Sequence, residues 1–270
     1  KSSVFFSADY AYFSSVSSSW LDHAKKYALS ITKALSLCSD SFVVEIASND
    51  GYLLRNFVEY GIPCLGVEPT HSTADAAESQ GIPVLREFFG KELGRQIAKS
   101  NSQADLIVGN NVFAHVPDIN DFALGLKVLL KGGGTVTLEF AHLMQLLRHS
   151  QFDTVYHEHF SYLSLGAVCQ IFSKAGLRIF DVEELLTHGG SLRVYGCHLD
   201  DPRNQSDNVK ELLNDEIKNG LEAEDVYSTF QVKANKIKDD LLNFLIETKR
   251  NGKKIVGYGA AAKGNTLLNY

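Results

Sequence analysis

Between residues 41 and 199, short apolar runs alternate with amphipathic stretches of helical length. Runs bounded by turn residues are typical of buried strands, and apolar residues at every third or fourth position indicate helices. The runs cover residues 42–46, 64–68, 82–86, 105–110 and 133–140, and helices are expected over residues 52–60, 71–80 and 118–130. Because crossovers between parallel strands are right-handed, these repeats predict an α/β fold, a parallel sheet with helices on both faces.

The last part of this region has a different spacing. Two strand-like runs, at residues 177–183 and 191–198, are separated only by residues 185–190. A connection this short permits a hairpin but not a helical crossover, so these strands should pair antiparallel. A parallel sheet with an antiparallel last strand resembles the Rossmann-like sheet of class I methyltransferases.

The chain divides into four segments. Residues 1–40 predict a helical lead-in to the α/β unit at residues 41–200. Residues 201–251 are charged and nearly free of Gly and Pro, which predicts a helical connector. Residues 252–270 predict a strand, a glycine-containing loop and a helix start, as in a second, truncated α/β domain. The first residue is not Met and the end falls within a periodic segment, which predicts a fragment.

Composition excludes several classes of partner. The net charge is −6, from 26 Lys and Arg against 32 Asp and Glu, with no basic cluster to grip nucleic acid. No apolar stretch reaches the roughly 18 residues of a membrane span, and no secretory signal begins the chain, so we expect a cytoplasmic protein. The cysteines Cys38, Cys64, Cys169 and Cys197 lack paired zinc-ligand spacing, and we expect reduced core residues.

A candidate cofactor loop covers residues 45–51, Glu-Ile-Ala-Ser-Asn-Asp-Gly, where the first strand turns into a helix. Small residues there allow close approach to a ligand, and a helix N-terminus offers free amides. The candidates are Glu45, Ala47, Asn49 and Gly51. The loop departs from the G-x-G-x-x-G fingerprint, and the alternative is an ordinary turn with Asn49 or Asp50 as the helix cap.

Further polar residues follow the neighbouring strands. Glu68 ends the second strand about twenty residues later, where a carboxylate can accept both ribose hydroxyls of a nucleoside. The alternative is a solvated strand-end carboxylate. Asn110 and Asn111 end the fourth strand at the same edge of the sheet. Residues 88–89, both Phe, either flank an adenine or pack in the core.

A second group of chemical residues covers residues 156–162, Tyr-His-Glu-His-Phe-Ser-Tyr. The two histidines could bind a metal, but no third ligand is evident, and we expect none. General acid–base chemistry fits better, because His titrates near neutrality and Tyr can donate to an oxyanion. His115 follows the fourth strand and should face the same crevice, although a structural role is the alternative.

Together these segments resemble the sugar C-methyltransferases that act on nucleotide-linked 4-keto deoxysugars. The resemblance covers nearly the whole chain and rests on residues 9–15, 18–20, 44–54, 66–69, 110–117, 156–163, 189–193 and 257–265. It implies three parts: an N-terminal zinc module, a central S-adenosylmethionine domain and a C-terminal Rossmann-like domain. We expect this chain to lack the first and nearly all of the third.

The resemblance also implies roles for individual residues. His159 would be the base that removes the proton next to the ketone, with Tyr156 and Glu158 orienting substrate or base. Tyr10 and His115 would line the sugar pocket and hold the enolate oxygen.

The ligands follow from the same resemblance. S-adenosylmethionine would be the cofactor, bound by the residues named above at the carboxyl edge. A nucleotide-linked keto-sugar would be the substrate, with Lys263 and Asn265 on its nucleotide. The oligomeric state is left open.

Two alternatives remain at this stage. An NAD-dependent sugar-nucleotide dehydrogenase or epimerase is supported by Glu68 and the loop at residues 257–264, but not by the first loop or the antiparallel ending. A non-catalytic sugar-nucleotide-binding fragment is the other.

Overall fold

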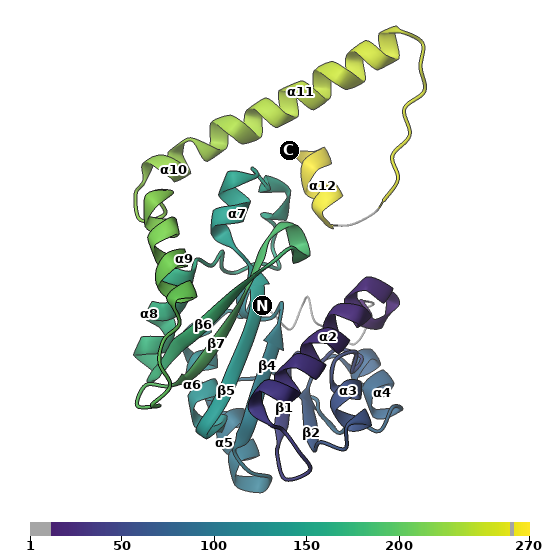
Figure 1. Cartoon of the computed structure of the whole chain (residues 1–270). Coiled ribbons are helices and arrows are strands. Elements are labelled where there is room, and N and C mark those ends of the chain that lie inside the picture. Colours follow the sequence, from purple (N-terminus) through teal and green to yellow (C-terminus); the bar gives the residue numbers. More distant parts are fainter. Residues whose placement is uncertain (1–11, 260–261) are drawn as a thin grey trace.

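Seven strands form one sheet in the computed structural model, which describes residues 12–259 and 262–270 (Figure 1). The strands are β1 (Val43–Ile46), β2 (Cys64–Val67), β3 (Val84–Leu85), β4 (Ala104–Asn110), β5 (Leu130–Ala141), β6 (Leu177–Leu185) and β7 (Ser191–His198). Their order is β3-β2-β1-β4-β5-β7-β6. Neighbouring strands from β3 to β5 are parallel, and β7 is antiparallel to β5 and β6. The predicted α/β class, with its antiparallel last strand, is confirmed.

Helices cover both faces of the sheet, because successive residues of a buried strand point to opposite sides. Val43 packs in one apolar cluster and Val44 in the other. Val43 shares its cluster with α2 (Ser18–Leu35), α3 (Leu54–Glu59) and α4 (His71–Glu78). Val44 shares its cluster with α5 (Lys91–Ser100), α6 (Ile119–Leu129), α8 (Leu165–Ala175) and α9 (Asp207–Lys218). The helices α5, α8 and α7 (Leu143–Arg148) were not predicted from the sequence.

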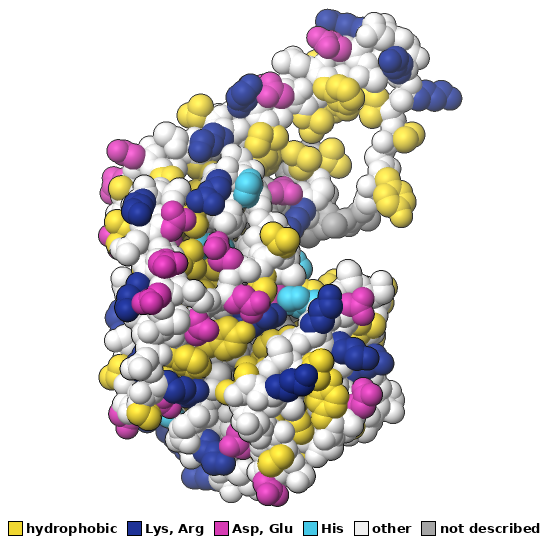
Figure 2. Space-filling model, viewed as in Figure 1, with side chains coloured by type: hydrophobic (Ala, Val, Ile, Leu, Met, Phe, Trp, Pro, Cys, Tyr) yellow, Lys and Arg dark blue, Asp and Glu magenta, His cyan; other side chains and the backbone are white. Residues whose placement is uncertain are grey.

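The charged segment after the sheet is broken into three helices rather than one. These are α9, α10 (Asp225–Ser228) and α11 (Phe230–Arg250). The break falls at Gly220, whose φ of +78° is favourable for glycine and ends α9. α11 extends away from the sheet and buries only Ala234 (Figure 1). Figure 2 shows hydrophobic side chains gathered along this helix.

Within residues 12–259 and 262–270, no helix combines the length and apolar character needed to cross a membrane.

A buried carboxylate joins α9 to the sheet domain. Glu216 accepts hydrogen bonds from His142 Nε2 at 2.7 Å and from the amides of Leu165 and Gly166 at 2.6 and 2.9 Å. Those amides begin α8, where donors have no partner within the helix. One side chain therefore caps α8 and anchors the first helix of the C-terminal region.

The strand expected over residues 252–258 is wrong. Residues 253–259 have no regular secondary structure, and no strand of the described chain lies beside them to complete a ladder. A helix follows, α12 (Ala262–Asn269), which contacts the short helix η3 (Phe152–Thr154). The ring of Tyr270 lies 4.9 Å from that of Phe152. The end of the chain is thereby brought near residues 156–162.

The cysteines are free thiols, but not all lie in the core. Cys64 and Cys197 are buried as expected, and Cys169 is half-buried. Cys38 is exposed, so its assignment to the core is wrong. It lies in the turn between α2 and β1, beyond the buried face of the helix.

Glycines allow α5 and α6 to touch backbone to backbone. A Cβ atom at Gly94 would lie 2.7 Å from the carbonyl oxygen of Gly125. Gly94→Ala should lower the free energy of unfolding by about 1–3 kcal/mol, because overpacking outweighs the helix propensity that alanine adds. Gly132→Ala is the matched control, since no atom lies within 4 Å of its added Cβ. Urea unfolding measures both; equal stability of the two variants would contradict the close contact.

Candidate active site

The loop between β1 and α3 has an unusual backbone. Ala47, Asn49 and Gly51 have φ values of +58°, +49° and +78°. Non-glycine residues rarely adopt this conformation, and it persists where surrounding contacts hold it. Glycine is favoured at residue 51 by its positive φ, and a Cβ there would lie 2.4 Å from Ile82 Cδ1, so the Ile82 side chain would have to move. The loop is rigidly shaped at the carboxyl edge of the sheet.

The side chains of this loop are tied to the N-terminal segment. Asn49 Oδ1 accepts from the Ser14 amide at 2.9 Å, and its Nδ2 donates to the Tyr12 carbonyl at 3.0 Å. Asp50 Oδ2 accepts from the Ser15 amide at 3.0 Å. The alternative of a helix cap is wrong, because α3 begins only at Leu54 and its N-cap residue makes no side-chain bond.

Glu68 lies under the loop and is only 5% exposed, so it is not a solvated carboxylate. It accepts hydrogen bonds from the amides of Asn49 and Thr70 at 3.0 and 2.9 Å, and from the Thr70 hydroxyl. An ionised carboxylate offers about four acceptor positions, so a further hydroxyl can still be accepted. Among the described residues, the buried Asp50 Oδ1 has no hydrogen-bond partner.

Two other candidate residues, Glu45 and Asn110, are buried. Glu45 is fully buried in β1, and burial together with the charges of Asp50 and Glu68 raises its pKa well above the ordinary value. A neutral Glu45 therefore supports the loop from below. Asn110 is also buried, and its Nδ2 donates to the Tyr52 hydroxyl at 3.4 Å.

The segment after η3 gathers rings around His159. The ring of Tyr156 lies 4.5 Å away, that of His115 4.7 Å and that of Tyr162 5.9 Å. His159 Nδ1 lies 2.7 Å from the Thr154 carbonyl, which can only accept. Nδ1 therefore donates to this carbonyl, and in the neutral ring the lone pair is on Nε2, which has no hydrogen-bond partner among the described residues.

His115 is held in the same way on η2 (Phe113–His115), with Nδ1 2.9 Å from the carbonyl of Glu158. Burial and the nearby His159 lower the pKa of His115 to about 4, so it is neutral at physiological pH. Burial and the charge of Glu158 raise the pKa of Tyr156, which keeps its hydroxyl proton. His157 is exposed.

The remaining predicted residues are dispersed. Tyr10 lies outside the described residues. Lys263 is half-buried at the start of α12, near enough to His188 to influence its titration. Asn265 is exposed and accepts from Asn269 on the same helix.

The aromatic pair at residues 88–89 can be compared with the structure. Core packing is the better description of Phe89, whose ring lies 5.3 Å from that of Phe122. No group of three or more His, Cys, Asp or Glu residues in the described ranges could hold a metal ion.

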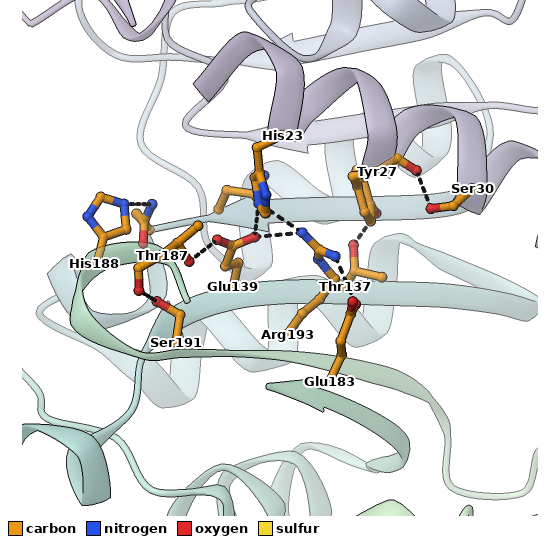
Figure 3. Close-up of polar contacts among 12 residues, drawn as sticks. His23, Tyr27, Ser30, Thr137, Glu139, Glu183, Thr187, His188, Ser191 and Arg193 are labelled. Atoms are coloured by element: carbon orange, nitrogen blue, oxygen red, sulfur yellow. Dashed lines mark hydrogen bonds and ion pairs between the residues drawn. The ribbon is translucent and has the colours of Figure 1, made fainter. Parts of the chain in front are cut away.

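Sequence reasoning missed a buried polar network beside this edge (Figure 3). Glu139 of β5 is 0% exposed and accepts from Arg193 of β7 at 2.8 Å, from His23 of α2 at 2.9 Å and from Thr187 at 2.9 Å. Burial would raise the pKa of Glu139, but the hydrogen bond from His23 and the charge of Arg193 outweigh it and hold the pKa below its ordinary value. The sequence signal for this network is a charged residue inside each of two apolar runs, Glu139 in residues 133–140 and Arg193 in residues 191–198.

Comparisons with known proteins agree with this geometry. A family described as "Methyltransferase domain" matches residues 20–182, and one described as "C-methyltransferase C-terminal domain" matches residues 186–270. C-methyltransferase NovU of Streptomyces niveus is 34% identical over 259 residues, which is 96% of this chain. The chain spans 62% of the length of NovU.

Solved structures share the fold at low identity. A methyltransferase of Clostridium acetobutylicum superposes with a TM-score of 0.52 at 11% identity, over 65% of this chain and 91% of that one. Magnesium protoporphyrin IX methyltransferase of Synechocystis, solved with bound SAH, gives 0.50 at 12% identity, over 65% and 81%. The strand order, its antiparallel β7 and the match over residues 20–182 agree: the chain belongs to the methyltransferase domain family and has the class I fold of S-adenosylmethionine-dependent methyltransferases.

Proposed function

We propose that this chain is the methyl-transferring part of a C-methyltransferase that acts next to the ketone of a nucleotide-linked keto-deoxysugar. The observation that carries the proposal is His159, whose Nδ1 donates to the Thr154 carbonyl, whose Nε2 has no partner in the described part of the chain, and whose ring lies beside those of Tyr156 and His115. The similarity to NovU and to a C-methyltransferase C-terminal domain supports carbon as the methylated atom. Membership of the methyltransferase family argues against an NAD-dependent dehydrogenase.

The loop and Glu68 fit S-adenosylmethionine. Glu68 keeps acceptor capacity for a ribose hydroxyl, and Asp50 Oδ1 is a buried acceptor without a partner in the described chain. Ala47, Asn49 and Gly51 would contribute backbone atoms, since the Asn49 side chain is already bonded to Ser14 and Tyr12 and its backbone N–H to Glu68. When bound, the cofactor supplies an electrophilic methyl group.

In the proposed reaction, one residue removes a proton from the substrate and another donates a hydrogen bond to the enolate oxygen. A proton next to a ketone is removable only if donors meet the charge that develops on the enolate oxygen. His159 Nε2 would take the proton, and Tyr156, with its raised pKa, would donate to the oxygen. A neutral His115 whose proton is on Nδ1 has none on Nε2 to donate. We therefore assign His115 to holding the His159 ring, rather than the enolate oxygen.

The first test concerns the cofactor. Glu68→Ala should weaken S-adenosylmethionine binding about tenfold to a hundredfold, because ribose hydroxyls and loop amides lose a charged acceptor. Calorimetry measures the affinity, and Glu59→Ala, at an exposed position on α3, is the control. Unchanged affinity in Glu68→Ala would place the ribose elsewhere.

The second test concerns the base. His159→Asn should reduce methyl transfer about 10²–10⁴-fold, the usual contribution of a positioned base, and leave cofactor affinity nearly intact. Exchange of the substrate's α-proton with deuterated solvent measures enolate formation separately, and it should be lost as well. His157→Asn, at an exposed neighbour, should exchange like wild type. Normal exchange in His159→Asn would assign the base to another residue, and no exchange in wild type would contradict the proposed reaction.

The third test uses pH. The pKa of His115 is about 4 when folded and about 6.5 when unfolded, so the unfolded chain binds the extra proton between these values. Stability should therefore fall by about 2–3 kcal/mol as pH drops through this window. Urea unfolding at pH 7.5 and 4.5 measures the loss, which should be smaller in His115→Gln. An equal loss in both proteins would mean that His115 is not buried as a neutral ring.

A further inference from the structure

A hydrogen bond connects the tip of the β6–β7 hairpin to the end of β4. His188 lies at this tip in η4 (Thr187–Gly189) (Figure 3). Its Nε2 is 3.0 Å from Asn111 Nδ2. Both residues adopt left-handed backbone, with φ values of +52° and +54°. Such conformations are uncommon outside glycine and require support from their surroundings.

The hairpin tip has that support. The Thr187 hydroxyl donates to Glu139 at 2.9 Å, and the Ser191 hydroxyl donates to the Thr187 carbonyl at 2.9 Å. The indole ring of Trp20 on α2 lies 5.3 Å from the His188 ring, edge on. His188 is therefore fixed from three elements before it reaches Asn111.

Asn111 in turn begins the segment that carries His115. Its amide donates to the Glu139 carbonyl at 2.7 Å, and η2 follows two residues later. Asn111, a cofactor-binding candidate from the sequence, has its side chain turned toward His188. The hydrogen bonds of Asn111 to His188 and Glu139 therefore help to fix the position of η2, and with it the position of the His115 ring beside His159.

We propose that His188 is a positioning residue of the acceptor site: its neutral imidazole holds the Asn111 carboxamide and thereby fixes His115 beside His159. The proposal rests on the proposed function, because it assigns His188 to the base of that reaction. Asn111 Nδ2 can only donate, so His188 Nε2 must be free of its proton. In a protonated His188, the Nε2–H donor would face the Nδ2–H donor of Asn111, and the hydrogen bond would break.

The surroundings favour the neutral ring. Burial lowers the pKa of His188, and so do Lys263 of α12, His23 of α2 and His159. Glu139 of β5 acts in the opposite direction and is already occupied by Arg193 and His23.

The first experiment does not depend on activity. Nitrogen-15 NMR of the histidine rings in the full chain should show His188 protonated at Nδ1 and not at Nε2 near pH 7. Asn111→Asp replaces the donor by a carboxylate, so the His188 pKa should rise by at least about one unit and Nε2 should become protonated. An unchanged tautomer and titration in Asn111→Asp would overturn the assigned hydrogen bond.

The second experiment separates positioning from packing. His188→Phe keeps a ring against Trp20 without an acceptor, and His188→Gln restores an acceptor at the same left-handed position. We expect kcat for α-proton exchange to fall about tenfold in His188→Phe and to recover to within about threefold of wild type in His188→Gln, with cofactor affinity unchanged in both.

Equal losses in both variants, or none in His188→Phe, would overturn the positioning role. Absence of exchange in wild type would instead contradict the proposed function, and the NMR titration would still decide the His188–Asn111 bond.

Discussion

The carboxylate of Glu139 holds together elements that no local interaction would join. It is fully buried and accepts from Arg193, His23 and Thr187, which come from β7, α2 and the hairpin tip. A buried charge is tolerated only when its hydrogen bonds are complete, so displacing one donor is costly. The β5–β7 register places Glu139 directly opposite Arg193. The same contact therefore selects the register of the antiparallel strand and docks α2 on the sheet.

This arrangement separates the edge of the sheet into two sides. The loop after β1 and Glu68 form the side proposed for the cofactor, whereas His159, Tyr156 and His115 gather after η3 and β4. The two sides meet at the carboxyl ends of the strands, where open α/β sheets bind ligands. Under the proposed function, a methyl donor and a carbon acid would be bound there together, each by its own set of residues.

Regular elements were predictable where a local pattern was strong. The strands, the hairpin and the helices α3, α4 and α6 follow from apolar periodicity and turn residues. The sequence also carries start and stop signals for α8, since Ser164 caps its start and Gly176, with φ of +82°, ends it. The prediction of a strand near residue 255 is wrong, because a strand needs a neighbouring strand to pair with, and periodicity does not show whether one is present.

By itself, the sequence determined the α/β class, the antiparallel last strand and the edge where the candidate residues collect, because the succession and spacing of apolar runs are local properties of the chain. Only the tertiary structure decided which side chains remain available there. In the folded chain, Asn49 is hydrogen-bonded to the N-terminal segment, Glu45 is buried beneath the loop, and the Asn111 side chain is hydrogen-bonded to His188. These outcomes depend on hydrogen bonds between residues 35 to 116 positions apart, such as Ser14 with Asn49 and His23 with Glu139. Hydrogen-bond partners at such separations depend on how whole helices and strands pack against one another, and a local sequence pattern does not contain that information.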